Sequence, residues 1–159
     1  MENRLETLRL KIDKLIKEKQ PEMDKYFYVH LYSVSQFCTL LALKRNLDVE
    51  LAATCGMLHD IYPVFTGSYD NHGIKGAEKA RKILKEMDLY NDEEISLITN
   101  AISRHSDKNI INGPYDEILK DGDVMSHCLY NNDFPISEKE IERYNKILKE
   151  FGCTENANI

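Results

Sequence analysis

The sequence predicts an all-α protein, a bundle of about six or seven helices. Apolar residues recur at helical spacing along most of the chain, and no run of strict apolar–polar alternation is long enough to predict a sheet. The 159 residues, 42% of them hydrophobic, suffice for one domain whose core needs neither disulfides nor a structural metal. We therefore expect any metal bound to this chain to serve a function.

Amphipathic stripes indicate the first two helices. An apolar stripe that starts at Leu5 predicts an N-terminal helix over residues 3–19, which ends before Pro21. A second helix runs from about Asp24 to Arg45. Its inward stripe consists of six apolar residues: Phe27, Leu31, Val34, Phe37, Cys38 and Leu41.

The third helix carries an apolar run into a pair of titratable residues. Asp48 is a suitable N-cap, and residues 51–58 are almost all apolar. The helix continues into His59 and Asp60 and ends before Pro63. We expect the stretch "PVFTGSYDNHG" that follows to form a loop. The His-Asp pair should reach the interior, where unpaired polar groups are costly.

Four further helices follow. The fourth covers Ala77–Met87, and the fifth starts with a capping box at Asn91. After a break at "NIINGPYD", the sixth runs from about Tyr115 to Tyr130. A last helix, over about 137–151, starts with another capping box at Ser137.

Two of the five histidines lie on core-facing helical stripes. His30 shares its stripe with Phe27 and Val34, and His105 follows Ile102 in the same way. One inward histidine alone is more often a hydrogen-bonded core imidazole, and this alternative stays open. Two of them beside a buried His-Asp pair favour a transition-metal site, because imidazole and carboxylate together form a common ligand set.

The sixth helix places a carboxylate on its inner face. Asp123 follows Leu119 by four positions and precedes Ser126 by three. A buried aspartate without a partner is costly or protonated, and a cation removes that difficulty. Asp121 should point elsewhere as a solvated charge. We interpret His127 as a helix-face histidine without a role, with a general acid or a hydrogen-bond donor to a metal ligand as the alternative.

The order of these residues resembles that of a known family, the HD-domain metal-dependent phosphohydrolases. Members have a histidine on an early helix, a His-Asp doublet after an apolar helix, further histidines, and an aspartate on a late helix. The matching residues, within an HD core over about 26–130, are His30, then His59 and Asp60 in "LHD", His72 in "HGIKGAE", His105 in "SRHSD" and Asp123 in "LKDGDVMSH". The doublet alone is weak, whereas the ordered set on helices is specific.

The resemblance implies one or two divalent metal ions per chain, of iron, manganese, zinc, cobalt, nickel or magnesium. The ligands of one metal would be His30, His59, Asp60 and Asp123. In members with two metals, a bridging aspartate and two further histidines complete the second site, here Asp60, His72 and His105. These same three residues would then be catalytic.

The resemblance also implies hydrolysis of a phosphoester or phosphoanhydride in a nucleotide or another small phosphorylated metabolite. "HGIKGAE" followed by a lone histidine points to members that cleave dinucleoside polyphosphates. Lys75 and Arg104 are candidates for binding the substrate phosphate, with solvated surface cations as the equal alternative. Arg104 stands where some members have paired histidines, which leaves one-metal and two-metal centres open. The residues after Asp60 are not acidic, which disfavours guanosine tetraphosphate hydrolysis.

Two other classes stay open. The chain could be a di-iron oxygenase, since a few HD relatives activate dioxygen with similar ligands, and iron content with oxygen consumption would distinguish it. It could also be a nucleotide-binding module whose metal site has lost catalysis. Activity against generic phosphoesters would separate that module from an enzyme.

Charge and composition restrict the partners. The net charge is −6 without any long basic block, which disfavours nucleic acid. No apolar stretch approaches the ~20 residues of a membrane span, and the charged N-terminus is unlike a signal peptide. We therefore expect a cytoplasmic protein whose partner is a small phosphorylated substrate, and a homodimer is compatible with the sequence. Cys38, Cys55 and Cys128 should be buried thiols.

Overall fold

The computed structural model describes residues 3–130 and 136–153. Helices make up most of these residues, and no strand occurs among them. The helices are α1 (Arg4–Lys19), α2 (Asp24–Lys44), α3 (Val49–Leu58), α4 (Ile61–Thr66), α5 (His72–Met87), α6 (Asp92–Arg104), α7 (Pro114–Tyr130) and α8 (Glu138–Glu150). The predicted all-α bundle is confirmed, and α4 is a short helix that the sequence did not indicate.

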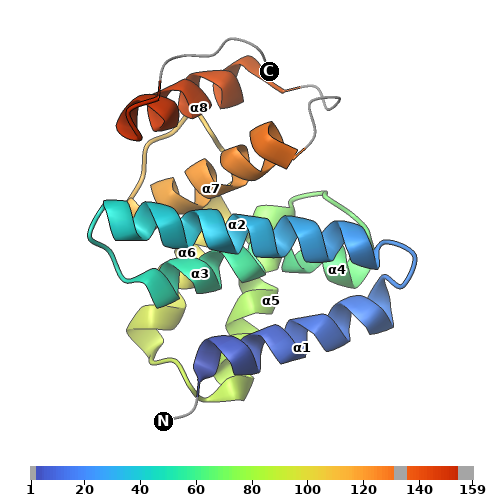
Figure 1. Ribbon diagram of the computed structural model, residues 1–159. Coiled ribbons are helices and arrows are strands. Elements are labelled where there is room, and N and C mark those ends of the chain that lie inside the picture. Colours follow the sequence, from blue (N-terminus) through green and yellow to red (C-terminus); the bar gives the residue numbers. More distant parts are fainter. Residues whose placement is uncertain (1–2, 131–135, 154–159) are drawn as a thin grey trace.

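The helices are arranged around α2, α3 and α7. In Figure 1, α1 and α8 lie at opposite ends of the molecule, with α2, α3 and α7 between them. Helix α2 packs most extensively against α3 and also against α7, whereas α5 packs mainly on α6. The central helices thus bring together chain segments that are far apart in sequence.

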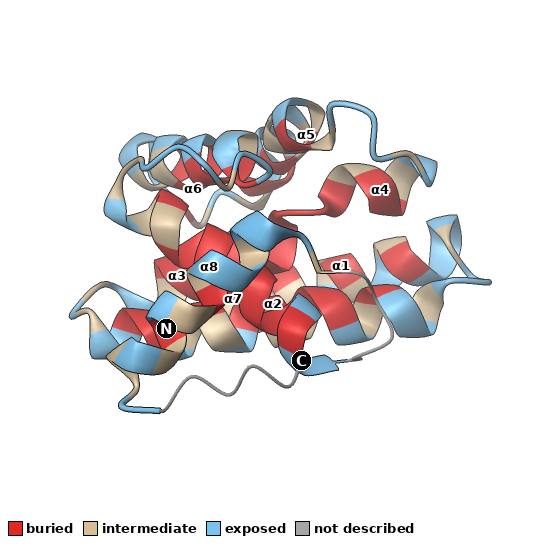
Figure 2. Cartoon of the chain, turned by 90° about the horizontal axis from the view of Figure 1, so that it is seen from above, coloured by how far each residue is buried: buried red, intermediate tan, exposed pale blue. Residues whose placement is uncertain are grey.

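Helix α3 is the most enclosed helix. Every residue of its segment Leu51–Leu58 is buried, and Figure 2 shows the burial concentrated on the central helices. A helix that is apolar on all sides is expected in the interior of a protein. Its burial carries His59 and Asp60, at its C-terminal end, into the core as predicted.

Two glycines allow α2 to approach its neighbours closely. A Cβ atom on Gly56 in α3 would lie 2.5 Å from the Cα atom of Ser35. A Cβ atom on Gly122 in α7 would lie 2.7 Å from the Cys38 Sγ atom. Because any side chain would force these helices apart, both positions need glycine.

The predicted helix starts at Asp48, Asn91 and Ser137 are confirmed. Each of these side chains accepts a hydrogen bond from a backbone N–H in the first turn, and the last two form capping boxes. Local hydrogen bonding of this kind can be read from sequence because both partners lie within four residues.

The predicted loop "PVFTGSYDNHG" is wrong at both ends. Pro63 lies in the first turn of α4, where the helix needs no backbone N–H from it. Helix α5 begins at His72 rather than at Ala77, so His72 is helical and the loop covers only residues 67–71. The early start brings His72 onto a fixed element instead of a loop.

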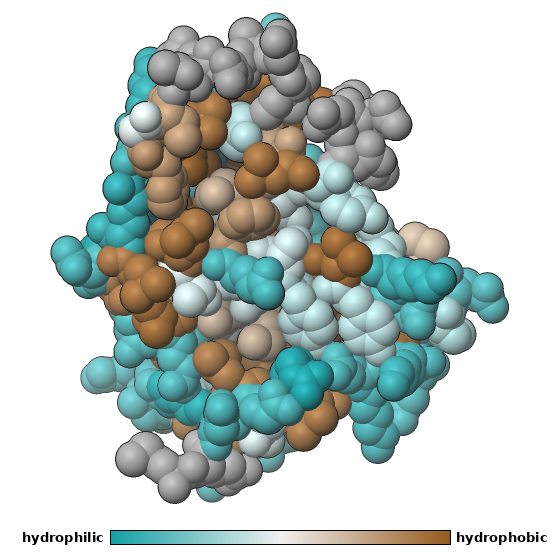
Figure 3. All heavy atoms as spheres, in the orientation of Figure 1, coloured by the Kyte–Doolittle hydropathy of each residue, from teal (hydrophilic) through white to brown (hydrophobic). Residues whose placement is uncertain are grey.

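The outer face of α2 carries exposed apolar residues, namely Val29, Leu40 and Leu43. Figure 3 shows that apolar side chains on the face seen in Figure 1 are interspersed with polar ones.

None of the helices in the two described ranges combines the length and the apolar character that a bilayer crossing requires. Cys38, Cys55 and Cys128 are buried and unpaired, as predicted.

Candidate metal centre

Six side chains converge where several helices begin or end. His30 lies in the second turn of α2, and Asp123 comes from the middle of α7. The other four lie at helix ends: His59 caps α3, Asp60 precedes α4, His72 opens α5 and His105 caps α6. We call these six residues the donor cluster.

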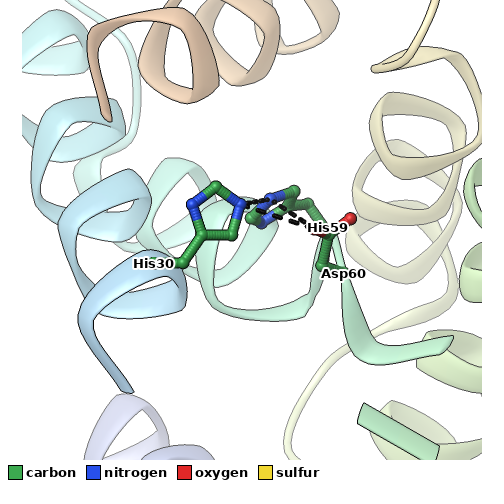
Figure 4. A group of neighbouring side chains, drawn as sticks. All are labelled: His30, His59 and Asp60. Atoms are coloured by element: carbon green, nitrogen blue, oxygen red, sulfur yellow. Dashed lines mark hydrogen bonds and ion pairs between the residues drawn. The ribbon is translucent and has the colours of Figure 1, made fainter. Parts of the chain in front are cut away.

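Four donor atoms form the first half of the cluster. His30 Nε2 lies 3.0 Å from His59 Nε2 and 3.4 Å from Asp60 Oδ2. Asp123 Oδ1 lies 3.6 and 3.8 Å from the same two nitrogens. Figure 4 shows the two imidazoles turned toward each other, with Asp60 beside them. Four ligands placed tetrahedrally about 2.1 Å from an ion are roughly 3.4 Å apart, so these separations fit one metal.

The other oxygen of Asp60 faces the second half of the cluster. Asp60 Oδ1 lies 3.5 Å from His72 Nε2 and 3.5 Å from His105 Nε2. These two nitrogens are 3.2 Å apart. One carboxylate thus borders both groups of donor atoms, each of which could hold a metal ion.

Backbone hydrogen bonds fix the orientation of three imidazoles. The Nδ1 atoms of His59, His72 and His105 each lie 2.7–2.9 Å from the backbone carbonyl three residues earlier. A carbonyl only accepts, so Nδ1 carries the proton and the neutral ring presents a lone pair on Nε2. The lone pairs of His72 and His105 therefore face each other, and a cation between them would turn this repulsion into coordination.

Two carboxylate oxygens support the same conclusion. Asp60 Oδ1 and Asp123 Oδ1 are buried and have no hydrogen-bond partner within the described part of the chain. Buried polar atoms are almost always satisfied, and a buried charge needs a partner or a metal. The donor set and these two oxygens fit divalent metal ions.

The electrostatics keep the donor groups in the forms that bind metals. Burial lowers the pKa of His59 to about 4, so the ring is neutral near pH 7. Burial opposes the ionisation of Asp123, but Lys108 and then His59 hold the pKa of its carboxyl group well below the usual value. Metal ligands of these types must be deprotonated, and both groups meet that requirement.

Comparison with protein families agrees with this geometry. The HD domain family matches residues 27–151 of the chain, a span that contains the whole donor cluster. The chain belongs to the HD-domain family. Membership places it in a superfamily of metal-dependent hydrolases that bind divalent ions, and leaves the substrate open.

One relative is an uncharacterized protein of Clostridium beijerinckii. It is 32% identical over 96 residues, which cover 57% of this HD-domain protein and 59% of the relative. The chain thus matches less than two thirds of that relative's length. No solved structure gives a significant match.

Lys108 is a residue of this HD domain that the sequence did not single out. Its Nζ atom donates to Asp123 Oδ2 at 2.5 Å and to the backbone carbonyl of His105 at 2.8 Å. Its side chain is only 10% exposed. Arg143, in α8, donates to the carbonyl of Lys108 and so fixes this segment. The contacts of Lys108 with Asp123 and Arg143 join residues 15 and 35 positions apart, so no local pattern indicates them.

His127 also contacts the donor cluster. Its ring stacks on that of His30, with the centroids 5.4 Å apart, and its Nε2 atom lies 3.6 Å from Asp123 Oδ1. On the other side, Nδ1 lies 2.8 Å from a carboxylate oxygen of Glu140 in α8, which raises the pKa of His127. The HD domain therefore places His127 against a candidate ligand. The sequence-based interpretation of His127 as a residue without a role did not include this contact.

A cleft of about 460 Å³ opens onto the donor cluster, with Lys108 and His127 in its walls. Lys75 and Arg104, the predicted phosphate-binding residues, are not among the residues that line it. Lys75 pairs with Asp70 at 2.9 Å, and Arg104 pairs with Asp116 at 3.3 Å. The structure therefore does not bring either cation to the cluster.

The predicted solvated position of Asp121 is wrong. The residue does point away from Asp123, but it is buried between Arg45 and Arg143, at 2.7 and 2.8 Å. Helix α8 covers this face of α7 and supplies Arg143. A helical phase read from α7 alone cannot show that another helix packs there.

Proposed function

We propose that the chain is a phosphohydrolase that cleaves a phosphoester or phosphoanhydride of a nucleotide or another small phosphorylated metabolite. Dinucleoside polyphosphates are among the candidate substrates. The observation that carries the proposal is the position of Asp60, whose two oxygens each face two imidazole nitrogens. This arrangement supports two adjacent metal ions that share one carboxylate.

The proposed ligands are His30, His59, Asp60 and Asp123 for one ion and Asp60, His72 and His105 for the other. Divalent ions in such a pair lower the pKa of bound water and offset charge on the phosphoryl oxygens. The carbonyl groups that accept from Nδ1 hold the imidazoles in place, so the ligands need little rearrangement.

Lys108 supplies the cation that we assign to the substrate phosphate. An ammonium group has three N–H donors, and two of those of Lys108 are used by Asp123 and by the carbonyl of His105. Among residues 3–130 and 136–153 the third donor has no hydrogen-bond partner, and the side chain lines the cleft. This assignment takes the place of Lys75 and Arg104, which bind carboxylates elsewhere.

Hydrolysis of generic phosphoesters tests the proposed function. Protein loaded with manganese, cobalt or nickel should hydrolyse p-nitrophenyl phosphate, bis(p-nitrophenyl) phosphate or both, and a panel of nucleotides and dinucleotides then ranks the substrates. Asp60→Asn should lose this activity. Asp88→Asn is the matched control, because Asp88 is an exposed cap of α5 in a left-handed conformation that asparagine tolerates.

Two outcomes would contradict the proposal. Absence of hydrolysis with every metal, in protein that binds the metal, would leave a binding module. Oxygen consumption by iron-loaded protein, without hydrolysis of any phosphoester, would instead support the oxygenase alternative.

A further inference from the structure

A second cavity adjoins the cleft of the donor cluster. Its volume is about 200 Å³, and its apolar wall is formed by Tyr26, Val29, Tyr130 and Ile136. We call it the side pocket. Whole small-molecule sites usually measure roughly 300–1,000 Å³, so the side pocket has room for one part of a ligand. The larger cleft beside it, at about 460 Å³, lies within that range.

The side pocket and the cleft share a wall. Tyr26, His30, His127 and Glu140 border both spaces. His30 belongs to the donor cluster, so one ligand can reach the cluster with one end and the side pocket with the other.

The chemistry of the wall favours a flat aromatic group. The rings of Tyr26 and His127 both stack on that of His30, at interplanar angles of 18° and 9°. Val29 and Tyr130 leave 40% and 60% of their surfaces exposed, although both are large apolar residues. Aromatic rings gain both from apolar burial and from stacking on other rings.

The carboxylate and the serine hydroxyl of the wall are already engaged. Glu140 bonds to His127 at 2.8 Å, and its second oxygen accepts from the backbone N–H and the hydroxyl of Ser137. The hydroxyl of Ser126 lies 2.7 Å from that of Ser33. No carboxylate without a partner faces the side pocket from its described lining, so a cationic ligand gains little there.

We infer that the side pocket binds an aromatic ring of the substrate while the phosphoryl group of the same molecule lies at the donor cluster. The substrate class is then a phosphoester with an aryl or heteroaryl group, nucleobases included, within a few bonds of the phosphorus. This inference rests on the proposed function, because it assumes a phosphoryl group at the cluster.

Binding of two phosphonates tests the inference without any turnover. Calorimetric titration of manganese-loaded protein with phenylphosphonate and with methylphosphonate compares ligands that differ in the ring alone. Burial of a ring of this size should make phenylphosphonate bind about tenfold to hundredfold more tightly. Val29→Trp fills the side pocket and should remove most of this difference, with the Kd of methylphosphonate unchanged.

Leu40→Trp is the matched control. Leu40 lies on the same helix and is 43% exposed, close to the 40% of Val29, but it does not line the side pocket. It should keep the full preference for phenylphosphonate. Equal Kd values for the two phosphonates in the wild type would overturn the inference and leave the proposed function standing. If neither phosphonate binds and no phosphoester is hydrolysed, the proposed function fails as well.

Discussion

Asp60 is the residue at which the two halves of the donor cluster can be tested together. Its Oδ2 atom lies 3.4 and 3.6 Å from the Nε2 atoms of His30 and His59, and its Oδ1 atom lies 3.5 Å from those of His72 and His105. Asparagine keeps the shape and one oxygen but loses the charge. At most one half of the cluster can then keep an oxygen from residue 60. The second half loses its only carboxylate, whereas the first half keeps that of Asp123.

The expected size of the effect follows from linkage. An ion that binds only the folded state stabilises it by about 2.7 kcal/mol at a concentration of 100 Kd. For a chain of this length, Tm rises by roughly 2–4 °C for each kcal/mol added to the free energy of unfolding, so one ion should raise Tm by about 5–10 °C. The wild type should show at least this rise when manganese replaces a chelator, and Asp60→Asn should lose most of it.

Thermal unfolding with and without manganese, together with elemental analysis, measures both quantities. Asp88→Asn, at an exposed helix cap, should behave like the wild type. If Asp60→Asn keeps the wild-type metal content and the full rise in Tm, the shared carboxylate does not hold metal. The cluster would then be a hydrogen-bonded core network, and the reasoning from its geometry would be refuted.

Four further predictions concern single residues. His72→Ala and His105→Ala should each lower the metal content by about one ion with the fold intact; unchanged metal in both, measured by elemental analysis, would refute the second site. Lys108→Met should raise KM about tenfold and keep the metal, as steady-state kinetics can show. Gly56→Ala should destabilise the fold by about 3 kcal/mol in thermal unfolding, since its Cβ would meet backbone at 2.5 Å. In chelated protein, the free energy of unfolding should fall as the pH is lowered from 6.5 to about 4, because His59 takes up a proton in the unfolded chain before it does in the folded one. Urea unfolding at several pH values should show a weaker dependence on pH in His59→Gln.

Helix starts with local caps and the burial of α3 could be predicted from sequence, but the start of α5 could not. Asn71, its N-cap, has a left-handed backbone and makes no side-chain capping bond. Gly73 is a weak helix former, and a contact with another helix explains why glycine stands there. A Cβ atom at this position would lie 3.0 Å from the carbonyl oxygen of Ser103 in α6. The sequence signal for a loop was in fact the requirement of a close helix–helix contact.

The candidate ligands could be predicted because each lies in a motif with a defined phase or order. Their surroundings could not. Three residues near the cluster form hydrogen bonds with partners 15, 13 and 35 positions away along the chain, namely Lys108, Glu140 and Arg143. Such pairs depend on how α7 and α8 pack, and no local pattern of charge or polarity encodes that packing.

The positions of the histidines at helix ends explain how this chain orients a candidate metal site with few residues. The last turn of a helix leaves carbonyl groups without an intrahelical N–H donor. Nδ1 of His59 lies 2.7 Å from the carbonyl oxygen of Gly56 in α3, and Nδ1 of His105 lies 2.7 Å from that of Ile102 in α6, which also accepts the backbone N–H of His105. The same hydrogen bond completes the helix end, selects the tautomer and aims Nε2 at Asp60. Helix termination and the orientation of the candidate ligands are therefore linked, because His59 and His105 directly follow the last residues of α3 and α6.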